Sequence, residues 1–308
     1  MSVIGIDTSN YTTSIAYFDG ENGVNCSRLL PVKPGELGLR QSDAVFAHTK
    51  SLPDLSGRLF SNAEVGKITA VGVSTRPRAV EGSYMPCFMV GYSHAKLLSD
   101  ALGVPLIEVS HQQGHVAASL WSADHLELMD EPHLAWHLSG GTTELLLVEP
   151  EGKNVKCTKI GGTTDISAGQ LIDRTGVMLD LPFPAGKHVD ALSKEANMKE
   201  TFKVKCPGME FSLSGVQNKV QQFHQKNDIP AETAAFALRC VASAVYQATQ
   251  NALKTYPGLK VVFSGGVASN SMLREVIAPL NPIFCEPQYS TDNAMGVAVL
   301  TDRYTQEG

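Results

Sequence analysis

Three stretches of the chain share one pattern, an apolar β-rich run that opens into a loop of Gly, Ser and Thr. They are Val3–Phe18 (VIGIDTSNYTTSIAYF), Leu134–Glu149 (LAWHLSGGTTELLLVE) and Leu259–Leu273 (LKVVFSGGVASNSML). The first two loops return into further β-rich runs, Thr13–Phe18 and Glu144–Val148, which predicts two hairpins whose turns can face a phosphate. A helical pattern follows the third loop over Ser269–Ile277, so helical N–H groups there could meet an anion or a nucleotide.

Other helical patterns cover about 86–103, 165–180, 232–255 and 293–305. Strands mixed with helices on this scale predict α/β layers. Asp7 and Ser139 in the first two loops lie 132 residues apart, close to half of the 308 residues, which is the spacing of a duplicated domain. We expect an actin or sugar-kinase type of architecture with domains at 1–130 and 131–308 and a nucleotide and metal cleft between them. The segments 182–186 and 203–215 are predicted loops flanking that cleft.

Composition narrows the class of protein. The chain has 43% apolar and 18% charged residues, typical of a globular protein. Its net charge of −6 argues against binding nucleic acid by its own electrostatics alone. Six scattered cysteines without a CxxC pair indicate neither a disulfide framework nor a thiolate zinc site. The N-terminus lacks the features of a signal peptide, and polar residues interrupt the apolar region 231–253. We expect a cytoplasmic protein with no membrane span.

Two histidine pairs have the spacing HxxxH. On a helix, His111 and His115 would share one face and could share a metal ion. His133 and His137 lie in a strand-like run, where four residues span about 13 Å, so that pair cannot chelate one ion. Gln112 stands where a zinc peptidase has its glutamate base, which argues against peptidase chemistry. Polar helix histidines without a metal remain the alternative for the first pair.

Each glycine loop, taken alone, is more often a tight turn than a phosphate cradle. Seven ordered motifs carry a more specific signal: GIDTSNYTTSIA, VSHQQGHVAAS, HLSGGTTELLLVE, TTDISAGQLIDRTGVMLDLPFPAG, EFSLSGVQNKV, FSGGVASNSMLRE and STDNAMGVA. In this order they resemble the TsaD family, the tRNA threonylcarbamoyladenosine synthases once called glycoproteases or O-sialoglycoprotein endopeptidases. The resemblance covers almost the whole chain.

The resemblance implies the duplicated, ribonuclease H-like fold of actin, hexokinase and the heat-shock ATPases. It implies transfer of a threonylcarbamoyl group from threonylcarbamoyl-AMP to N6 of an anticodon-adjacent adenosine in tRNA. The implied ligands of one divalent metal, iron or zinc, are His111, His115 and Asp292. The implied residues for an adenine nucleotide (threonylcarbamoyl-AMP, ATP, ADP or AMP) are His137, Leu138, Ser139, Gly140, Gly141, Asp173, Gly186, Asp190 and Asn270. It assigns no catalytic side chain. The implied partners are tRNA, TsaB-like and TsaE-like proteins, and a second subunit in a homo- or heterodimer.

The chain also departs from the family pattern. The departures are Asn10, Tyr11 and Thr12 in the first motif, Thr142 for a histidine, Ile166 and Gln170 for carboxylates, and the segment 76–86 for a glycine-rich turn. Loss of two carboxylates predicts slower catalysis than in standard members, unless those positions serve helix capping or solubility. The alternatives are a noncatalytic or repurposed paralog that acts as a nucleotide-binding scaffold, and an ATP-dependent small-molecule kinase. A patch including Arg76, Arg78 and Lys96 could meet tRNA phosphates, although such a group is more often a solvated face.

Overall fold

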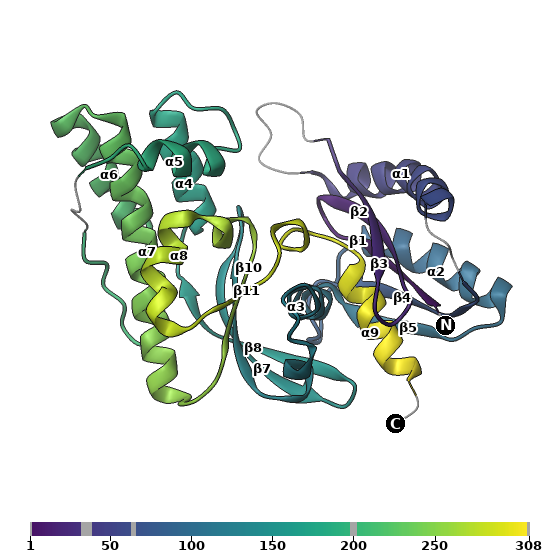
Figure 1. Cartoon of the computed structure of the whole chain (residues 1–308). Helices are drawn as coiled ribbons and strands as arrows, with labels where there is room; N and C mark the ends of the chain where they lie inside the picture. Colours follow the sequence, from purple (N-terminus) through teal and green to yellow (C-terminus); the bar gives the residue numbers. More distant parts are fainter. Residues whose placement is uncertain (1, 32–38, 63–65, 198–201, 307–308) are drawn as a thin grey trace. The chain divides into compact units, whose positions relative to one another are not determined.

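A computed structural model describes residues 2–31, 39–62, 66–197 and 202–306. The chain forms two compact units (Figure 1). Unit 1 contains Met1–Glu131, Glu149–Cys157 and Gln288–Gly308, and unit 2 contains Pro132–Val148 and Thr158–Pro287. The first boundary lies beside the predicted one at 130, whereas the C-terminal segment, predicted within 131–308, packs with unit 1.

Unit 1 is built on a five-stranded sheet in the order β3-β2-β1-β4-β5. Its strands are β1 (Ser2–Thr8), β2 (Thr12–Phe18), β3 (Gly23–Leu29), β4 (Ile68–Arg76) and β5 (Leu106–Ser110). Its helices are α1 (Gln41–Asn62), α2 (Phe88–Leu102), α3 (His111–Ser122), η1 (Leu126–Asp130) and α9 (Met295–Thr305). The first three strands pair antiparallel, while β4 and β5 extend the sheet in parallel.

Helices cover both faces of the central strand β1, which is why all seven of its residues are buried. A Cβ added at Gly5 would lie 2.6 Å from the Ala298 backbone of α9, whereas Thr8 accepts a hydrogen bond from the N–H of Gly91 on α2. Successive residues of a strand point to opposite faces, so Gly5 and its neighbour Ile6 serve different layers. A strand buried on both faces reads as a continuous apolar run, as VIGI does.

Glycine contacts explain why the C-terminal helix belongs to unit 1. A Cβ at Gly296 on α9 would lie 1.8 Å from the carbonyl oxygen of Gly114 on α3, and one at Gly72 on β4 would lie 1.7 Å from Thr301 Oγ1. Only residues without a side chain allow backbones to approach this closely. Helix α9, near the C-terminus, therefore packs against the sheet that contains the N-terminal strand β1.

Unit 2 has a six-stranded sheet in the order β11-β10-β6-β7-β8-β9. The strands are β6 (His133–Leu138), β7 (Thr143–Glu151), β8 (Asn154–Thr163), β9 (Glu210–Phe211), β10 (Val261–Ser264) and β11 (Ile283–Phe284). The helices are α4 (Ala168–Met178), α5 (Gly186–Ser193), α6 (Ser214–Asn227), α7 (Pro230–Thr255), η2 (Gly266–Ser269), α8 (Ser271–Ile277), η3 (Ala278–Leu280) and η4 (Pro287–Tyr289, at the boundary with unit 1). The core packs α7 against Trp136, whose indole N–H donates to Thr249 Oγ1 at 2.9 Å.

The two sheets repeat one arrangement. The hairpin β6-β7 and the parallel strands β10 and β11 occupy the places that β1-β2, β4 and β5 hold in unit 1. The predicted duplication, both hairpins and the four helical patterns are therefore confirmed, with helix ends shifted by up to three residues. Helices α5 and α6 begin at the ends of segments predicted as loops. Among the described residues, no helix is long and apolar enough to cross a membrane.

Candidate functional site

Helix α3 starts at a defined residue because Ser110 and Gln113 form a capping box. Ser110 Oγ accepts the Gln113 N–H at 3.2 Å, and Gln113 Oε1 accepts the Ser110 N–H at 2.9 Å. This cap places His111 first on the helix and His115 one turn later. The helix that the HxxxH spacing required is confirmed.

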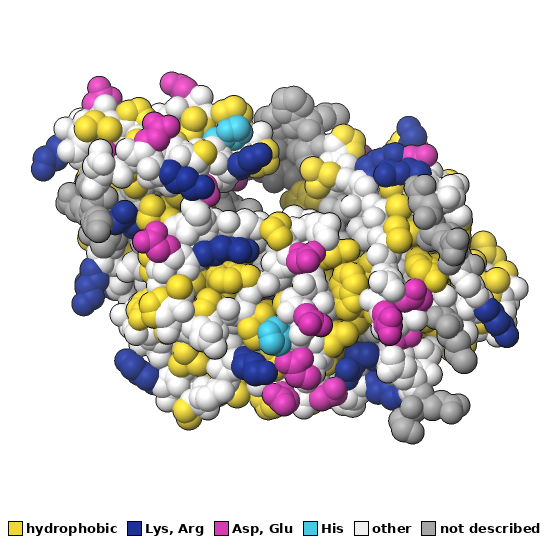
Figure 2. Space-filling view, in the orientation of Figure 1, with side chains coloured by type: hydrophobic (Ala, Val, Ile, Leu, Met, Phe, Trp, Pro, Cys, Tyr) yellow, Lys and Arg dark blue, Asp and Glu magenta, His cyan; other side chains and the backbone are white. Residues whose placement is uncertain are grey.

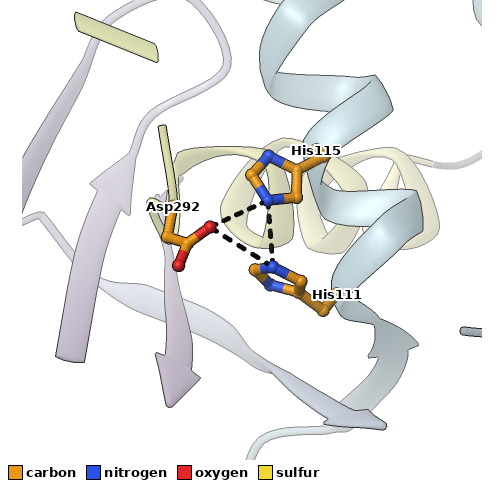
Figure 3. A group of neighbouring side chains, drawn as sticks. All are labelled: His111, His115 and Asp292. Carbon is orange, nitrogen blue, oxygen red and sulfur yellow. Dashed lines mark hydrogen bonds and ion pairs between the residues drawn. The ribbon is translucent and has the colours of Figure 1, made fainter. Parts of the chain in front are cut away.

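The structure brings the three predicted metal ligands together within unit 1 (Figure 3). His115 Nε2 lies 2.9 Å from His111 Nε2 and 3.1 Å from Asp292 Oδ1, and His111 Nε2 lies 3.5 Å from the same oxygen. Asp292 stands three residues before α9, so the glycine packing of α9 carries it to α3. Metal binding by this cluster remains a prediction, and the distances between its donor atoms can be compared with those that a metal ion requires.

The donor set fits a divalent cation. Ligands bound at about 2.1 Å to one ion in tetrahedral or octahedral geometry lie roughly 3 to 3.5 Å apart, and the three donor distances fall at 2.9, 3.1 and 3.5 Å. Two imidazole nitrogens and one carboxylate suit zinc and iron(II) and leave positions open for other ligands. His133 and His137 lie on β6 and belong to no such group among the described residues.

Opposite charges balance one another in this cluster. Burial opposes protonation of His111, but the charges of Asp7 and Asp292 and their hydrogen bonds outweigh it and raise the pKa of that imidazole well above its ordinary value. Burial likewise opposes ionisation of Asp292, but hydrogen bonds and charges from His111 and His115 hold its pKa well below the usual range. The cluster thus keeps its carboxylate ionised, as a metal ligand must be.

Unit 2 holds a pocket of ≈ 530 Å³ between α4, α5, η2 and the loops beside them. Its lining is Gly140, Gly169, Ile172, Asp173, Pro184, Gly186, Lys187, Asp190, Gly266, Val267, Ser269 and Asn270. Five predicted nucleotide residues are in this lining: Gly140, Asp173, Gly186, Asp190 and Asn270. His137, Leu138, Ser139 and Gly141 lie outside it, and the Leu138 side chain is fully buried.

Glycine backbone forms much of this pocket. A Cβ at Gly140, Gly186 or Gly266 would meet no atom within 4 Å, so the space beside these residues is open. At Gly169, in contrast, a Cβ would lie 2.5 Å from Gly140 Cα, and the N-terminus of α4 packs against the loop 139–142. Ser167 Oγ donates to the Gly140 carbonyl at 2.6 Å, which fixes this contact.

The pocket carboxylates mainly hold the scaffold. Asp190 Oδ1 accepts hydrogen bonds from Asn270 Nδ2 at 2.9 Å and from the Ser271 N–H and Oγ at 3.0 and 2.8 Å. Asn270 Oδ1 accepts the Leu273 N–H. The N–H groups of Ser271 and Leu273 are therefore already bonded to Asp190 and Asn270, and contact between the third loop and a nucleotide stays a prediction.

Asp173 and Lys187 complete the polar lining. Asp173 Oδ1 accepts the Ala185 N–H at 2.8 Å, and burial raises the pKa of this carboxyl. Lys187 was not predicted, although it directly follows Gly186 in the sequence. Gly169, Ile172 and Pro184 were also missed. Gly266, Val267 and Ser269 belong to the third loop, which was expected to face the nucleotide.

Two departures from the family pattern have structural roles here. Gln170 forms a capping box with Ser167 at the start of α4, where its Oε1 accepts the Ser167 N–H at 3.1 Å. Ile166 is partly buried against the core of unit 2. The capping alternative for position 170 is therefore supported by a direct contact.

Comparison with known proteins decides the family. The model of TsaD, described as tRNA N6-adenosine threonylcarbamoyltransferase, matches residues 37–299. The chain belongs to the TsaD family. It is 33% identical over 310 residues to a protein of that name from Carboxydothermus hydrogenoformans, covering 96% of this chain and 90% of that protein. For the protein of that name from Thermosipho africanus, identity is 31% over 329 residues, with 100% and 96% covered.

Solved structures agree on the fold of this TsaD family member. Full-length HypF in a phosphate- and nucleotide-bound form aligns with a TM-score of 0.62 at 15% identity, covering 100% of this chain and 47% of that one. A ROK hexokinase from Thermus thermophilus aligns with a TM-score of 0.55 at 15% identity over the whole of both chains. At such identity the likeness shows the fold alone, and the predicted hexokinase-like α/β fold is confirmed.

Proposed function

We propose that this protein transfers a threonylcarbamoyl group from threonylcarbamoyl-AMP to N6 of the adenosine beside the anticodon of a tRNA. The observation that carries the proposal is the assembled cluster of His111, His115 and Asp292, with donor atoms 2.9 to 3.5 Å apart, in a chain of the TsaD family. A complete ligand set favours an active transferase over a scaffold that has lost its chemistry.

His111, His115 and Asp292 would hold one divalent cation, iron or zinc. When bound, such a cation supplies Lewis-acid polarisation of the threonylcarbamoyl carbonyl. The chain's own contribution is to keep the two imidazole nitrogens and the carboxylate aimed at one point. The exocyclic amine of adenine is a weak nucleophile, so orientation of the two substrates must supply much of the acceleration. No catalytic side chain is assigned.

The adenylate would occupy the pocket of unit 2. The open spaces beside Gly140 and Gly266 allow a ligand to approach the backbone there. Lys187 supplies a cation for a phosphate, while Asp173 keeps one carboxylate oxygen beyond its bond to Ala185 for a ribose hydroxyl. AMP, the leaving group, would thus be held by backbone and a few polar side chains.

Binding of tRNA would require positively charged surface from partner proteins. Lys and Arg are scattered among uncharged and acidic side chains on the face in Figure 2, and the net charge is −6. Lys96, one of three residues considered for phosphate contact, lies 2.5 Å from Asp100 Oδ2, which offsets its charge. We therefore propose TsaB-like and TsaE-like partner proteins, with a homo- or heterodimer as the working assembly. The cytoplasmic location stays a prediction.

The test is complementation of a bacterial strain depleted of its own TsaD. Mass spectrometry of tRNA nucleosides should show threonylcarbamoyladenosine restored by the wild-type chain and absent with His111→Ala. His125→Ala is the matched control, because His125 lies in the same unit, is half-buried and pairs with Glu127 outside the cluster. Metal and nucleotide binding without any modified nucleoside, with partner proteins supplied, would instead establish the noncatalytic paralog.

A further inference from the structure

The end of β1 and the residue after it contact the metal cluster directly. Asp7, Thr8 and Ser9 form the DTS motif that was expected to face a phosphate. In the structure, Asp7 Oδ2 lies 2.6 Å from His111 Nδ1, and Ser9 Oγ donates to Asp292 Oδ2 at 3.0 Å. Two residues of one motif therefore each touch a different predicted metal ligand, on the atom that faces away from the cluster centre.

Asp7 is held rigidly. Its side chain is only 2% exposed, and its other oxygen, Oδ1, accepts the hydroxyl of Ser74 on β4 at 2.7 Å. Asp7 belongs to the central strand of the sheet, and Thr8 beside it is anchored to α2. A carboxylate so removed from water requires partners for both oxygens, and Ser74 and His111 supply them.

We propose that Asp7 is a positioning residue for the metal site, and this inference rests on the proposed metal-dependent function. By accepting the Nδ1–H of His111, Asp7 selects the tautomer whose Nε2 lone pair faces His115 and Asp292. A neutral imidazole carries one proton, so fixing it at Nδ1 leaves Nε2 to coordinate. Ser9 acts on Asp292 in the same sense: it binds Oδ2 and leaves Oδ1 toward the histidines.

This arrangement gives the first loop a different task from the glycine loop of unit 2. A carboxylate beside a phosphate would repel it, whereas a carboxylate that accepts a hydrogen bond from a ligating imidazole strengthens the basicity of the coordinating nitrogen. Removal of such a partner typically costs 10 to about 100-fold in metal affinity. We expect a loss in that range for Asp7→Asn and a smaller loss for Ser9→Ala.

The experiment measures Zn²⁺ affinity of the full chain by competition with a chromophoric chelator, and the visible absorption of the Co²⁺-loaded protein. Asp7→Asn is compared with Asp302→Asn, a second carboxylate of unit 1 that is 8% exposed and bonds to Gln306 rather than to the cluster. Asp7→Asn should bind Zn²⁺ about 10 to 100-fold more weakly and shift the Co²⁺ bands, while Asp302→Asn changes neither. Unchanged Zn²⁺ affinity in folded Asp7→Asn overturns the proposal.

A second measurement covers the case in which Asp7→Asn does not fold. Nitrogen-15 NMR of histidine-labelled, Zn²⁺-loaded wild type should show His111 protonated at Nδ1 and coordinated through Nε2. Coordination through Nδ1 would overturn the inference without any variant. Wild-type protein that binds Zn²⁺ in this way but forms no threonylcarbamoyladenosine would contradict the proposed transfer while leaving the role of Asp7 intact.

Discussion

The same structural position carries different chemistry in the two units. Asp7 is the penultimate residue of β1 and bonds to Ser74 on the parallel neighbour β4. His137 is the penultimate residue of β6, and its Nδ1 lies 3.4 Å from Ser264 Oγ on the parallel neighbour β10. A duplicated hairpin thus ends in a carboxylate that supports a metal cluster in one copy and in an imidazole beside the glycine loop in the other.

The surroundings of these two strand ends differ as well. In unit 1, the cluster is made of side chains, and two of them, His111 and Asp292, are hydrogen-bonded to Asp7 and Ser9 outside the cluster. In unit 2, open glycine backbone forms the pocket wall, and Asp190 is used to hold the helix after the third loop. Metal affinity should therefore fall when a cluster side chain is removed. Nucleotide affinity should fall when a side chain is added to a glycine of the pocket.

The largest expected effect is loss of the metal in His111→Ala. With one of three donors gone, Zn²⁺ affinity should fall by more than about 100-fold, as read by elemental analysis after dialysis and by chelator competition. His125→Ala should retain the wild-type metal content. A metal content in His111→Ala equal to that of wild type would remove the cluster from the proposed site.

Gly140→Ala should lower AMP affinity about tenfold, because its methyl group enters the pocket of unit 2 and overpacking costs roughly 1 to 3 kcal/mol. The matched control is Gly141→Ala, since that glycine is equally open but lies outside the pocket lining. Isothermal titration of both variants with AMP distinguishes binding in this pocket from binding elsewhere. Equal affinities for the two variants would mean that the nucleotide binds elsewhere.

Lys187→Met probes the cationic side chain in the lining of the unit 2 pocket. An exposed ion pair contributes up to about 1 kcal/mol, so AMP affinity should fall roughly fivefold while adenosine affinity stays unchanged. Lys194→Met on the same segment is the control, since Lys194 contacts the outer oxygen of Asp190 and lies outside the pocket lining. An equal loss for adenosine and AMP would contradict a phosphate contact.

Asp165→Asn should destabilise unit 2 by about 1 kcal/mol at pH 7. Burial opposes ionisation of Asp165, but bonds from Ser212, Ser214 and the Leu213 N–H prevail and lower its pKa. A depressed carboxyl pKa stabilises the fold above the unfolded value of about 3.9 and loses that effect as pH falls through the folded value. Urea unfolding should therefore show wild type and variant converging below about pH 4; a gap that widens on acidification would disprove this.

The smallest effect is expected for Gln170→Glu, which restores a family carboxylate. A glutamate can keep the capping box with Ser167 and adds a charge at a helix N-terminus, so stability should rise by a few tenths of a kcal/mol. The transfer rate should stay within about twofold if position 170 serves only the cap. A large rate gain would instead support the prediction that loss of this carboxylate slows catalysis.

Sequence alone determined what local patterns encode. The HxxxH spacing lies within little more than one helical turn, and both hairpins follow from apolar β-rich runs joined by Gly, Ser and Thr residues, so these features were predicted. Asp292 carried no local signal, because 177 residues separate it from His115 and only the family resemblance pointed to it. The motif HLSGGTTELLLVE likewise pointed to Gly140 as a pocket residue, but no motif pointed to Lys187.

Only the tertiary structure decided how distant groups share their hydrogen bonds. The packing of Gly296 on Gly114 placed the C-terminal helix in unit 1, and with it Asp292 beside His115. Sheet pairing places Asp7 between Ser74 and His111. Asp190 accepts the Ser271 N–H at the start of the helix after the third loop. Periodicity fixes which face of an element is apolar, but which donors meet which acceptors depends on close packing between segments far apart in the chain.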